Sequence, residues 1–182
     1  MRRRPAPSGE TSVLMSSERT CPGCGLQMPV REKADSHAYY NTSPECWNVY
    51  TEVLEAEYSD AVLFGNVHQL TVDSYAVQHA GGIHPDKSVV IHLIGLHLVY
   101  VRGIRPTSVA PQLQQVATGV KSWPHFEPPT KLWALTVADV ALVAGIHGRH
   151  ASAVREWSEE VWRAWAAHHA EIAALAARHL VV

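Results

Sequence analysis

Cys21-Pro22-Gly23-Cys24-Gly25 is the stretch that decides how the rest of this 182-residue chain is interpreted. Two cysteines separated by two residues, with glycine allowing the backbone to turn, are the usual first half of a zinc or iron site. The chain has three cysteines, and the third is Cys46. The site must therefore be completed by Cys46 and a histidine, or by histidines alone.

Length and composition indicate one ordinary globular domain. The chain is 47% hydrophobic and 18% charged, which is typical of a folded protein rather than a disordered or membrane-spanning one. Its net charge of −2 with neutral histidines provides no broad basic field for nucleic acid or anionic lipid. No apolar run reaches the ~20 residues that a membrane helix needs. We expect a single domain over residues 21–182, preceded by a disordered or loosely attached tail over residues 1–20.

Cysteine usage and the N-terminal sequence favour a cytoplasmic protein. Three cysteines, two of them in one CxxC knuckle, fit a metal site in a reducing compartment better than a disulfide framework. The basic run over residues 1–4 is not followed by the apolar segment of a secretory signal. The twelve histidines are an unusual number for this length and favour metal or proton chemistry.

Helix signals predict an all-α fold, a bundle of about five helices behind an irregular N-terminal segment that a metal ties down. The first helix begins with a Ser43 cap followed by Pro44 and Glu45, all preferred at helix starts. A turn is expected over residues 59–66. A long connection with about one helical turn is expected over residues 104–135, which hold five prolines and resemble a functional loop or lid. The predicted helices cover residues 43–59, 68–79, 86–102, a short segment from 136, and 151–179.

Helix pairing predicts which residues complete the metal site. A short turn makes the helices over 43–59 and 68–79 antiparallel, so facing residues have numbers that add to about 125. This register places Cys46 opposite His79. The next turn likewise brings His92 close to His79, and the knuckle can fold back onto the same end of the bundle.

The predicted metal ligands are Cys21, Cys24, Cys46 and His79, and the predicted ion is Zn²⁺. Three thiolates and one imidazole are a common ligand set of structural zinc sites. The fourth ligand is less determined than the cysteines, because other histidines lie at suitable positions. The alternatives are His37, which makes a compact array with the three cysteines, and then His92 and His68.

The candidate catalytic residues are His92, Asp73 and Tyr75. Asp73 and Tyr75 are polar groups in the middle of a helix that should be buried. Either they satisfy each other or a histidine through buried hydrogen bonds, or they act as an acid–base pair or orient a ligand histidine.

Other histidines have more ordinary interpretations. A histidine on an apolar helix, such as His97, is usually a hydrogen-bonded core residue, whereas His168 is also placed where it could reach a metal inside the bundle. His125 is expected to be exposed, and His147 and His150 are expected to lie in a solvated loop.

Several of these stretches together resemble a bacterial family that is catalogued only as a domain of unknown function. The resemblance covers nearly the whole chain from Cys21, which implies one domain rather than a fragment, and it implies no activity. The stretches are Cys21-Pro-Gly-Cys-Gly, Ser43-Pro-Glu-Cys46-Trp47, residues 68–79 (HQLTVDSYAVQH), residues 88–96 (SVVIHLIGL), and the helix that contains Trp157, Trp165, His168 and His169.

Two functions follow from the predicted metal site. In the first, a zinc ion with an open coordination position serves an enzyme that hydrolyses or eliminates a small molecule, and the connection over 104–135 covers the pocket with Trp123 and Trp133. In the second, a closed Cys₃His site fastens the N-terminal segment to the bundle of a protein that binds a partner. A thiol redox protein is a third possibility, against which the lack of a βαβ pattern argues. HExxH, GxSxG, GxGxxG and phosphate-loop motifs are absent from the sequence.

Overall fold

The computed structural model describes residues 17–31 and 35–180. The prediction of a helical protein is confirmed, with seven α-helices rather than about five in this part of the chain. A small hairpin precedes them. The elements are β1 (Glu18–Thr20), β2 (Gln27–Pro29), α1 (Pro44–Tyr58), α2 (Ala61–Gln78), α3 (Asp86–Tyr100), a 3₁₀ turn (Pro106–Ser108), α4 (Val109–Gly119), α5 (Val137–Ala141), α6 (His147–Ala164), a second 3₁₀ turn (Ala166–His168) and α7 (His169–His179).

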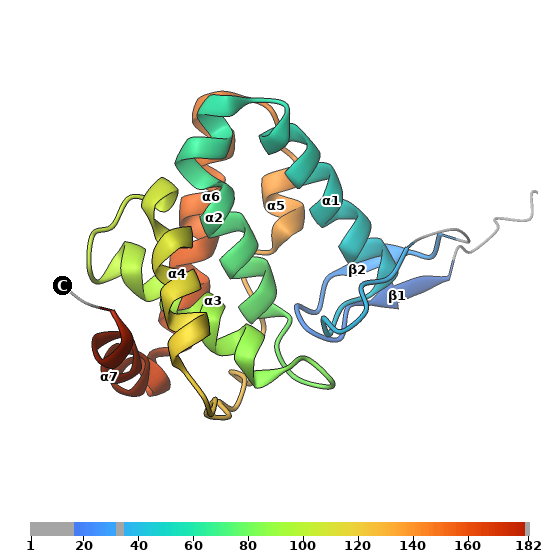
Figure 1. Cartoon of the computed structure of the whole chain (residues 1–182). Helices are drawn as coiled ribbons and strands as arrows, with labels where there is room; N and C mark the ends of the chain where they lie inside the picture. The colour runs from blue at the N-terminus through green and yellow to red at the C-terminus, as the bar shows by residue number, and fades with distance from the viewer. Residues whose placement is uncertain (1–16, 32–34, 181–182) are drawn as a thin grey trace, which may run out of the picture.

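Helix α2 is the centre of the bundle. It packs against α1, α3 and α6, and Figure 1 shows it between these neighbours. Every residue from Leu70 to Ala80 except Val72 is buried. Such burial on all sides explains why this segment has little amphipathic pattern, because a helix surrounded by other elements has no solvent face to mark with polar residues.

The hairpin is a feature that the all-α prediction missed. β1 and β2 pair antiparallel with Arg19 opposite Met28, and the CxxC knuckle is the turn between them. Within that turn Cys21 N donates to Leu26 O at 2.8 Å, and Gly25 adopts a positive φ of 77° that favours glycine. β1 falls within the last residues of the predicted tail, of which residues 1–16 lie outside the described part of the chain.

Capping side chains set the starts of α1 and α2. Ser43 caps α1 as predicted, and its hydroxyl accepts from Cys46 N at 3.2 Å. The turn predicted over residues 59–66 is wrong, because Asp60 caps α2 by accepting from Val62 N and Leu63 N. A polar cap directly after α1 therefore starts the next helix at once, which lengthens α2 by two turns.

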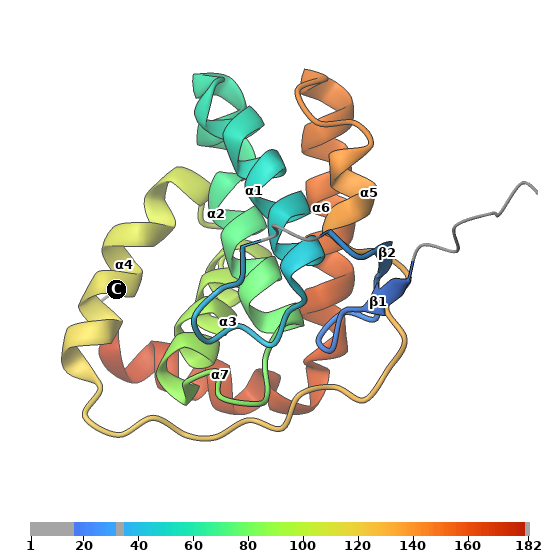
Figure 2. The same ribbon diagram turned by 90° about the vertical axis from the view of Figure 1, so that its right-hand side faces the viewer.

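The segment over 104–135 is more ordered than predicted, because it contains the whole of α4. Only residues 120–136 remain extended, and we call them the connection. Figure 2 shows the connection running along the lower edge of the bundle from α4 to α5. Thr136 and Asp139 form a capping box that ends the connection and starts α5.

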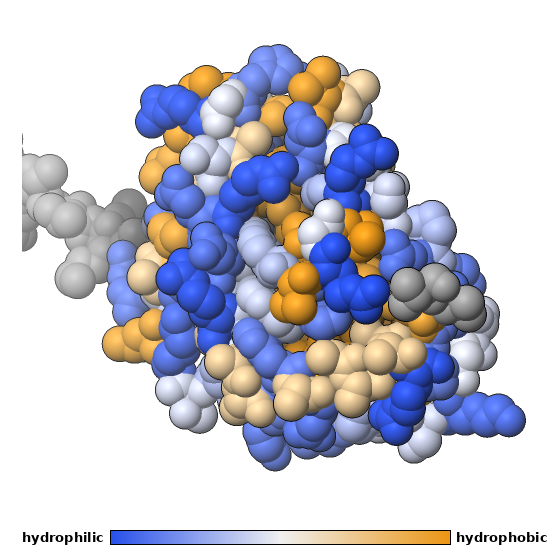
Figure 3. All heavy atoms as spheres, turned by 90° about the vertical axis from the view of Figure 1, so that its left-hand side faces the viewer, coloured by the Kyte–Doolittle hydropathy of each residue, from blue (hydrophilic) through white to orange (hydrophobic). Residues whose placement is uncertain are grey.

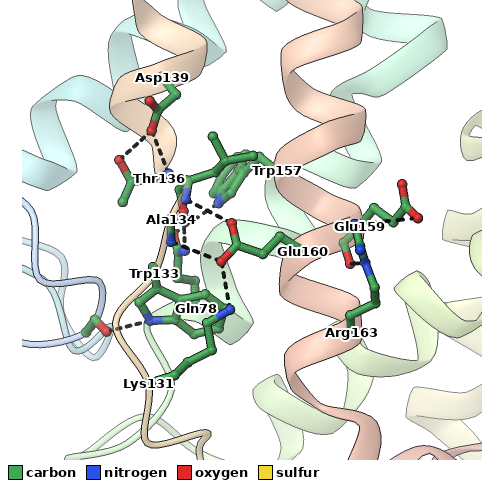
Figure 4. Close-up of polar contacts among 12 residues, drawn as sticks. Gln78, Lys131, Trp133, Ala134, Thr136, Asp139, Trp157, Glu159, Glu160 and Arg163 are labelled. Carbon is green, nitrogen blue, oxygen red and sulfur yellow. Dashed lines mark hydrogen bonds and ion pairs between the residues drawn. The ribbon is translucent and has the colours of Figure 1, made fainter.

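Hydrogen bonds from two helices hold the last part of the connection (Figure 4). The Glu160 carboxylate, on α6, accepts from Ala134 N at 3.0 Å and Leu135 N at 2.8 Å. From α2, Gln78 Nε2 donates to Leu135 O at 2.9 Å, while Gln78 Oε1 accepts from Trp157 Nε1 at 3.1 Å. The connection is therefore fixed to the bundle by polar contacts that its own sequence does not reveal.

The closing helix predicted over 151–179 is divided in two. α6 begins at His147, four residues earlier than predicted, and the chain turns at Trp165 into a 3₁₀ segment before α7. Trp165 is fully buried, as are Trp157 and Val161. Trp157 and Trp165 would share one face of a straight helix, so the sequence pattern around Trp165 does not show this break.

Polar and apolar residues are mixed on the one face of the molecule that Figure 3 shows. On the face opposite the hairpin, hydrophilic and hydrophobic residues alternate (Figure 3). Across the described residues, no helix combines the length and apolarity that crossing a membrane requires.

Candidate metal centre

Cys21, Cys24, Cys46 and His79 come together in one cluster, which we call the Cys₃His quartet. Their ligand atoms all lie within 4.8 Å of one another. The Cys24 and Cys46 sulfurs are 3.7 Å apart, and Cys46 Sγ is 3.4 Å from His79 Nε2. Tetrahedral zinc with ordinary bond lengths separates two sulfurs by about 3.8 Å and a sulfur from a nitrogen by about 3.5 Å. The spacing of the quartet therefore fits a zinc ion.

Three separate elements deliver the quartet. The hairpin turn carries Cys21 and Cys24, the first turn of α1 carries Cys46, and His79 directly follows α2. The knuckle lies directly on the histidine, because a Cβ on Gly23 would be 2.7 Å from His79 Cδ2 and 2.5 Å from Asn41 O. Only glycine allows this approach, and a metal at the quartet would join the hairpin to both helices.

Neighbouring groups orient the ligands in a way that suits a metal. His79 Nδ1 donates to Tyr75 O at 2.8 Å, which leaves Nε2 as the ligand atom. The Tyr75 hydroxyl donates to Cys46 Sγ at 3.6 Å and lies 2.7 Å from Thr42 Oγ1, which is 3.6 Å from Cys21 Sγ. These hydroxyls place donors beside sulfurs that would carry negative charge.

The pKa values of the quartet residues depend on one another, in a way that a bound cation would change. Hydrogen bonding with Cys24 lowers the pKa of Cys21, and the same contact raises the pKa of Cys24. Burial alone would lower the pKa of His79, but hydrogen bonds with Cys21 and Cys46 raise it to about 9. The contact that favours a thiolate at Cys21 therefore disfavours one at Cys24, whereas a divalent ion would stabilise both.

The quartet is closed to solvent. Cys24 is 4% exposed, Cys21 is 1% exposed, and Cys46 and His79 are fully buried. A cavity of about 290 Å³ lies beside the knuckle, where Gly23, Asn41 and Trp133 are among its lining residues, but none of the four quartet residues lines it. A substrate in this cavity would meet residues such as Asn41, Gln78 and Trp133 rather than the quartet.

The rival histidines lie outside the quartet. His37 Nδ1 accepts from Tyr39 N and Tyr40 N, at 3.3 and 3.1 Å, and stacks on the Tyr40 ring. His68 contacts Glu57, and His92 contacts Asp73. His168 Nε2 lies 3.2 Å from Glu127 O, on the connection. Of the candidate histidines, His79 is the one that lies beside Cys46, as the predicted pairing of the two helices implies, and its role as a metal ligand stays a prediction.

The three candidate catalytic residues divide between two places. Tyr75 lies beside the quartet, where its hydroxyl contacts Cys46 and its ring stacks on Tyr50 with centroids 3.9 Å apart. Asp73 and His92 form a separate pair on α2 and α3, with Asp73 Oδ1 2.8 Å from His92 Nδ1. The structure thus brings Asp73 and His92 together but not with the metal ligands, and their catalytic role stays a prediction.

Gly95 makes room for the Asp73 carboxylate. A Cβ at position 95 would collide with Asp73 Oδ2 and lie 2.7 Å from Asp73 Cγ. Gly95→Ala is therefore expected to lower the free energy of unfolding by about 1–3 kcal/mol, although alanine is the better helix former. Chemical denaturation measures this change.

The Asp73→Ala background provides the control for this prediction. Without the carboxylate, Gly95→Ala should be neutral or stabilising by up to about 1 kcal/mol, as helix propensity alone implies. If Gly95→Ala had the same effect in both backgrounds, contact with Asp73 would not be the reason for the glycine.

Glu57 forms a buried cluster that sequence reasoning missed. Its carboxylate lies 2.8 Å from His68 Nδ1 and 3.1 Å from His150 Nε2, and accepts from Thr71 Oγ1 at 2.5 Å. The prediction that His150 lies in a solvated loop is wrong, because it is fully buried on α6. The register that pairs Cys46 with His79 also pairs Glu57 with His68, so this contact could have been found.

The structure also shows where two further histidines and the two tryptophans of the 104–135 segment lie. His97 is buried as predicted, and the His125 side chain is 59% exposed beside Asp86. Trp133 Nε1 donates to Gly23 O at 3.3 Å, so the connection touches the knuckle itself. The ring of Trp123 lies instead under the Lys87 ammonium, 5.9 Å from its centroid.

Comparison with known proteins adds a family but no activity. No curated protein and no solved structure matches the chain. A model of a family of unknown function, DUF5946, matches residues 19–166, a range that includes the whole quartet, Asp73 and His92. The chain therefore belongs to the DUF5946 family.

Proposed function

We propose that this protein is a zinc-binding helical domain in which the Cys₃His quartet holds one structural Zn²⁺. The observation that carries the proposal is the quartet itself, four buried ligand atoms that all lie within 4.8 Å of one another. Zinc would join the hairpin to α1 and α2, in addition to the ion pair at 3.0 Å between Arg19 on β1 and Glu45 on α1. The metal would thus fasten the N-terminal segment to the helical bundle, as in the predicted protein with a closed Cys₃His site.

A catalytic zinc has less support. Catalytic sites use three protein ligands and keep a fourth position for water or substrate. Here four protein ligands converge, and the adjoining cavity beside Gly23 is not lined by any of them. Tyr75, one of the predicted acid–base groups, is fully buried and bonded to Cys46, which suits a group that orients a ligand.

Metal content and coordination test the proposal. Protein purified without chelators should contain about one equivalent of zinc, and cobalt substitution should give the absorption spectrum of a tetrahedral site with three thiolates. Less than half an equivalent of any transition metal would overturn the proposal. A cobalt spectrum that responds to added azide or cyanide would reveal an open position and would favour the enzyme.

A matched pair of variants assigns the fourth ligand. His79→Ala should remove the metal or change the cobalt spectrum, because imidazole supplies the only nitrogen. His37→Ala should leave both unchanged, since the His37 ring accepts only from the backbone of Tyr39 and Tyr40. The opposite result would assign the compact array that includes His37.

A further inference from the structure

Asp73 and His92 form a second polar site away from the quartet. Asp73 lies six residues before His79 on α2, which is a rise of about 9 Å along the helix axis. Its carboxylate is fully buried, and among the described residues its ionic partner is His92, with no lysine or arginine in contact. An apolar side chain at position 73 would serve packing better than a buried carboxylate without a cation.

Two neighbours adapt to this carboxylate. Gln69 Nε2 donates to Asp73 Oδ1 at 2.8 Å, the same oxygen that accepts from His92. Asp73 Oδ2 has no hydrogen-bond partner in the described part of the chain, and it lies against Gly95. Glycine inside a helix is unfavourable, so α3 also bears a cost for the position of Asp73. Together these residues hold one imidazole.

His92 differs from His79, His84 and His150 in how its ring nitrogens are used. His79, His84 and His150 each have contacts at both nitrogens. His92 has a contact only at Nδ1, its Nε2 has no hydrogen-bond partner among the described residues, and its side chain is 16% exposed. The Asp73 carboxylate fixes the proton on Nδ1, so the Nε2 lone pair is available at the surface.

His68 resembles His92 in one respect, since buried Glu57 holds its Nδ1. Its ring, however, stacks on Phe64 with centroids 4.4 Å apart, at the far end of α1 and α2.

We propose that Asp73 and His92 form a general-base site that activates water or a hydroxyl group of a small uncharged molecule, independently of the zinc. His92 Nε2 accepts the proton while the oxygen forms its new bond to an electrophilic carbon. Asp73 is a positioning residue that holds Nδ1–H and stabilises the imidazolium. The leaving group departs with its bonding electrons and takes the proton back from Nε2. The negative field of Asp73 disfavours an anionic ligand.

Hydrolysis of p-nitrophenyl acetate by the zinc-loaded protein tests the base. His92→Gln is expected to lower the rate above the uncatalysed reaction by at least about tenfold. His125→Gln is the matched control, because His125 Nδ1 also meets a carboxylate, that of Asp86 at 2.7 Å, but on the open surface. Its rate should stay within about twofold of wild type. Equal rates for His92→Gln and wild type would overturn the proposal.

Nitrogen NMR of the ring tests the role of Asp73 without any activity. In the wild type His92 should be the Nδ1–H tautomer, and in Asp73→Leu, which has the same number of side-chain heavy atoms, it should shift toward the Nε2–H form. An Nε2–H tautomer in the wild type would overturn the proposal. A second equivalent of Zn²⁺ that binds the wild type but not His92→Gln would also overturn it, because His92 would then be a metal ligand. Neither result depends on the quartet being structural.

Discussion

Cys46→Ser is expected to unfold the domain at neutral pH, with loss of the metal and of cooperative thermal unfolding. Zinc binding contributes about 10–16 kcal/mol in small zinc domains, whereas a whole domain is stable by only about 5–15 kcal/mol. Cys46, on α1, contacts both Cys24 of the hairpin and His79 after α2, so its substitution removes the ligand that lies between the other two elements. Circular dichroism melting together with zinc analysis measures the effect, and a strong chelator should reproduce it in the wild type.

His92→Gln is the control for Cys46→Ser. It also changes a potential metal ligand near α2, but His92 lies outside the quartet and is partly exposed. This variant should keep one equivalent of zinc and a melting temperature close to wild type. A Cys46→Ser protein that retained both zinc and its melting temperature would contradict the structural role of the metal.

Glu57→Ala is expected to lower the free energy of unfolding by about 3–5 kcal/mol, as for other broken buried polar clusters. The substitution leaves His68, Thr71 and His150 without their common acceptor in the interior. Denaturant titration measures this change. Glu52→Ala, on the same helix, is the matched control and should change stability by less than about 0.5 kcal/mol, because Glu52 is 59% exposed and pairs with Arg31 only at 3.7 Å.

The pH dependence of stability provides an independent measurement on Glu57. Burial alone would raise the pKa of Glu57, but hydrogen bonds from His150, His68 and Thr71 lower it. A carboxyl group with a lowered pKa in the folded state adds stability above its unfolded pKa of about 4.3 and loses it as the pH falls through the folded value. The advantage of wild type over Glu57→Gln should therefore be full at pH 7 and shrink below about pH 4.3. An advantage that is independent of pH would show that charge at Glu57 is unimportant.

Capping residues, proline and glycine predicted the helix ends at which they lie. The Ser43 cap and Pro44 set the start of α1, and Gly103 follows the end of α3 as expected. The α1–α2 pairing was also readable, because Cys46–His79 and Glu57–His68 both join residues whose numbers add to 125, although the turn lies at Ser59–Asp60 rather than over 59–66. This is why His79 could be selected from twelve histidines before its contact with Cys46 was known.

Features that depend on distant partners were missed. The break after α6 leaves the spacing of Trp157 and Trp165 on one helical stripe unchanged, and the contacts of the connection depend on Gln78 and Glu160 from other helices. His150 was misplaced because its acceptor, Glu57, is distant in sequence and belongs to α1. A local pattern cannot report a partner that only the folded chain brings close.

The sequence by itself determined that this is a helical domain with a metal-type knuckle, because ligand spacing and helix caps are local properties. Only the tertiary structure decided that the Cys₃His quartet is closed, since burial depends on how the hairpin, α1 and α2 meet. It also separated His92 from the quartet and paired it with Asp73 on α2. The physical reason is that backbone register orders residues along a helix, whereas packing of neighbouring helices decides which side chains touch.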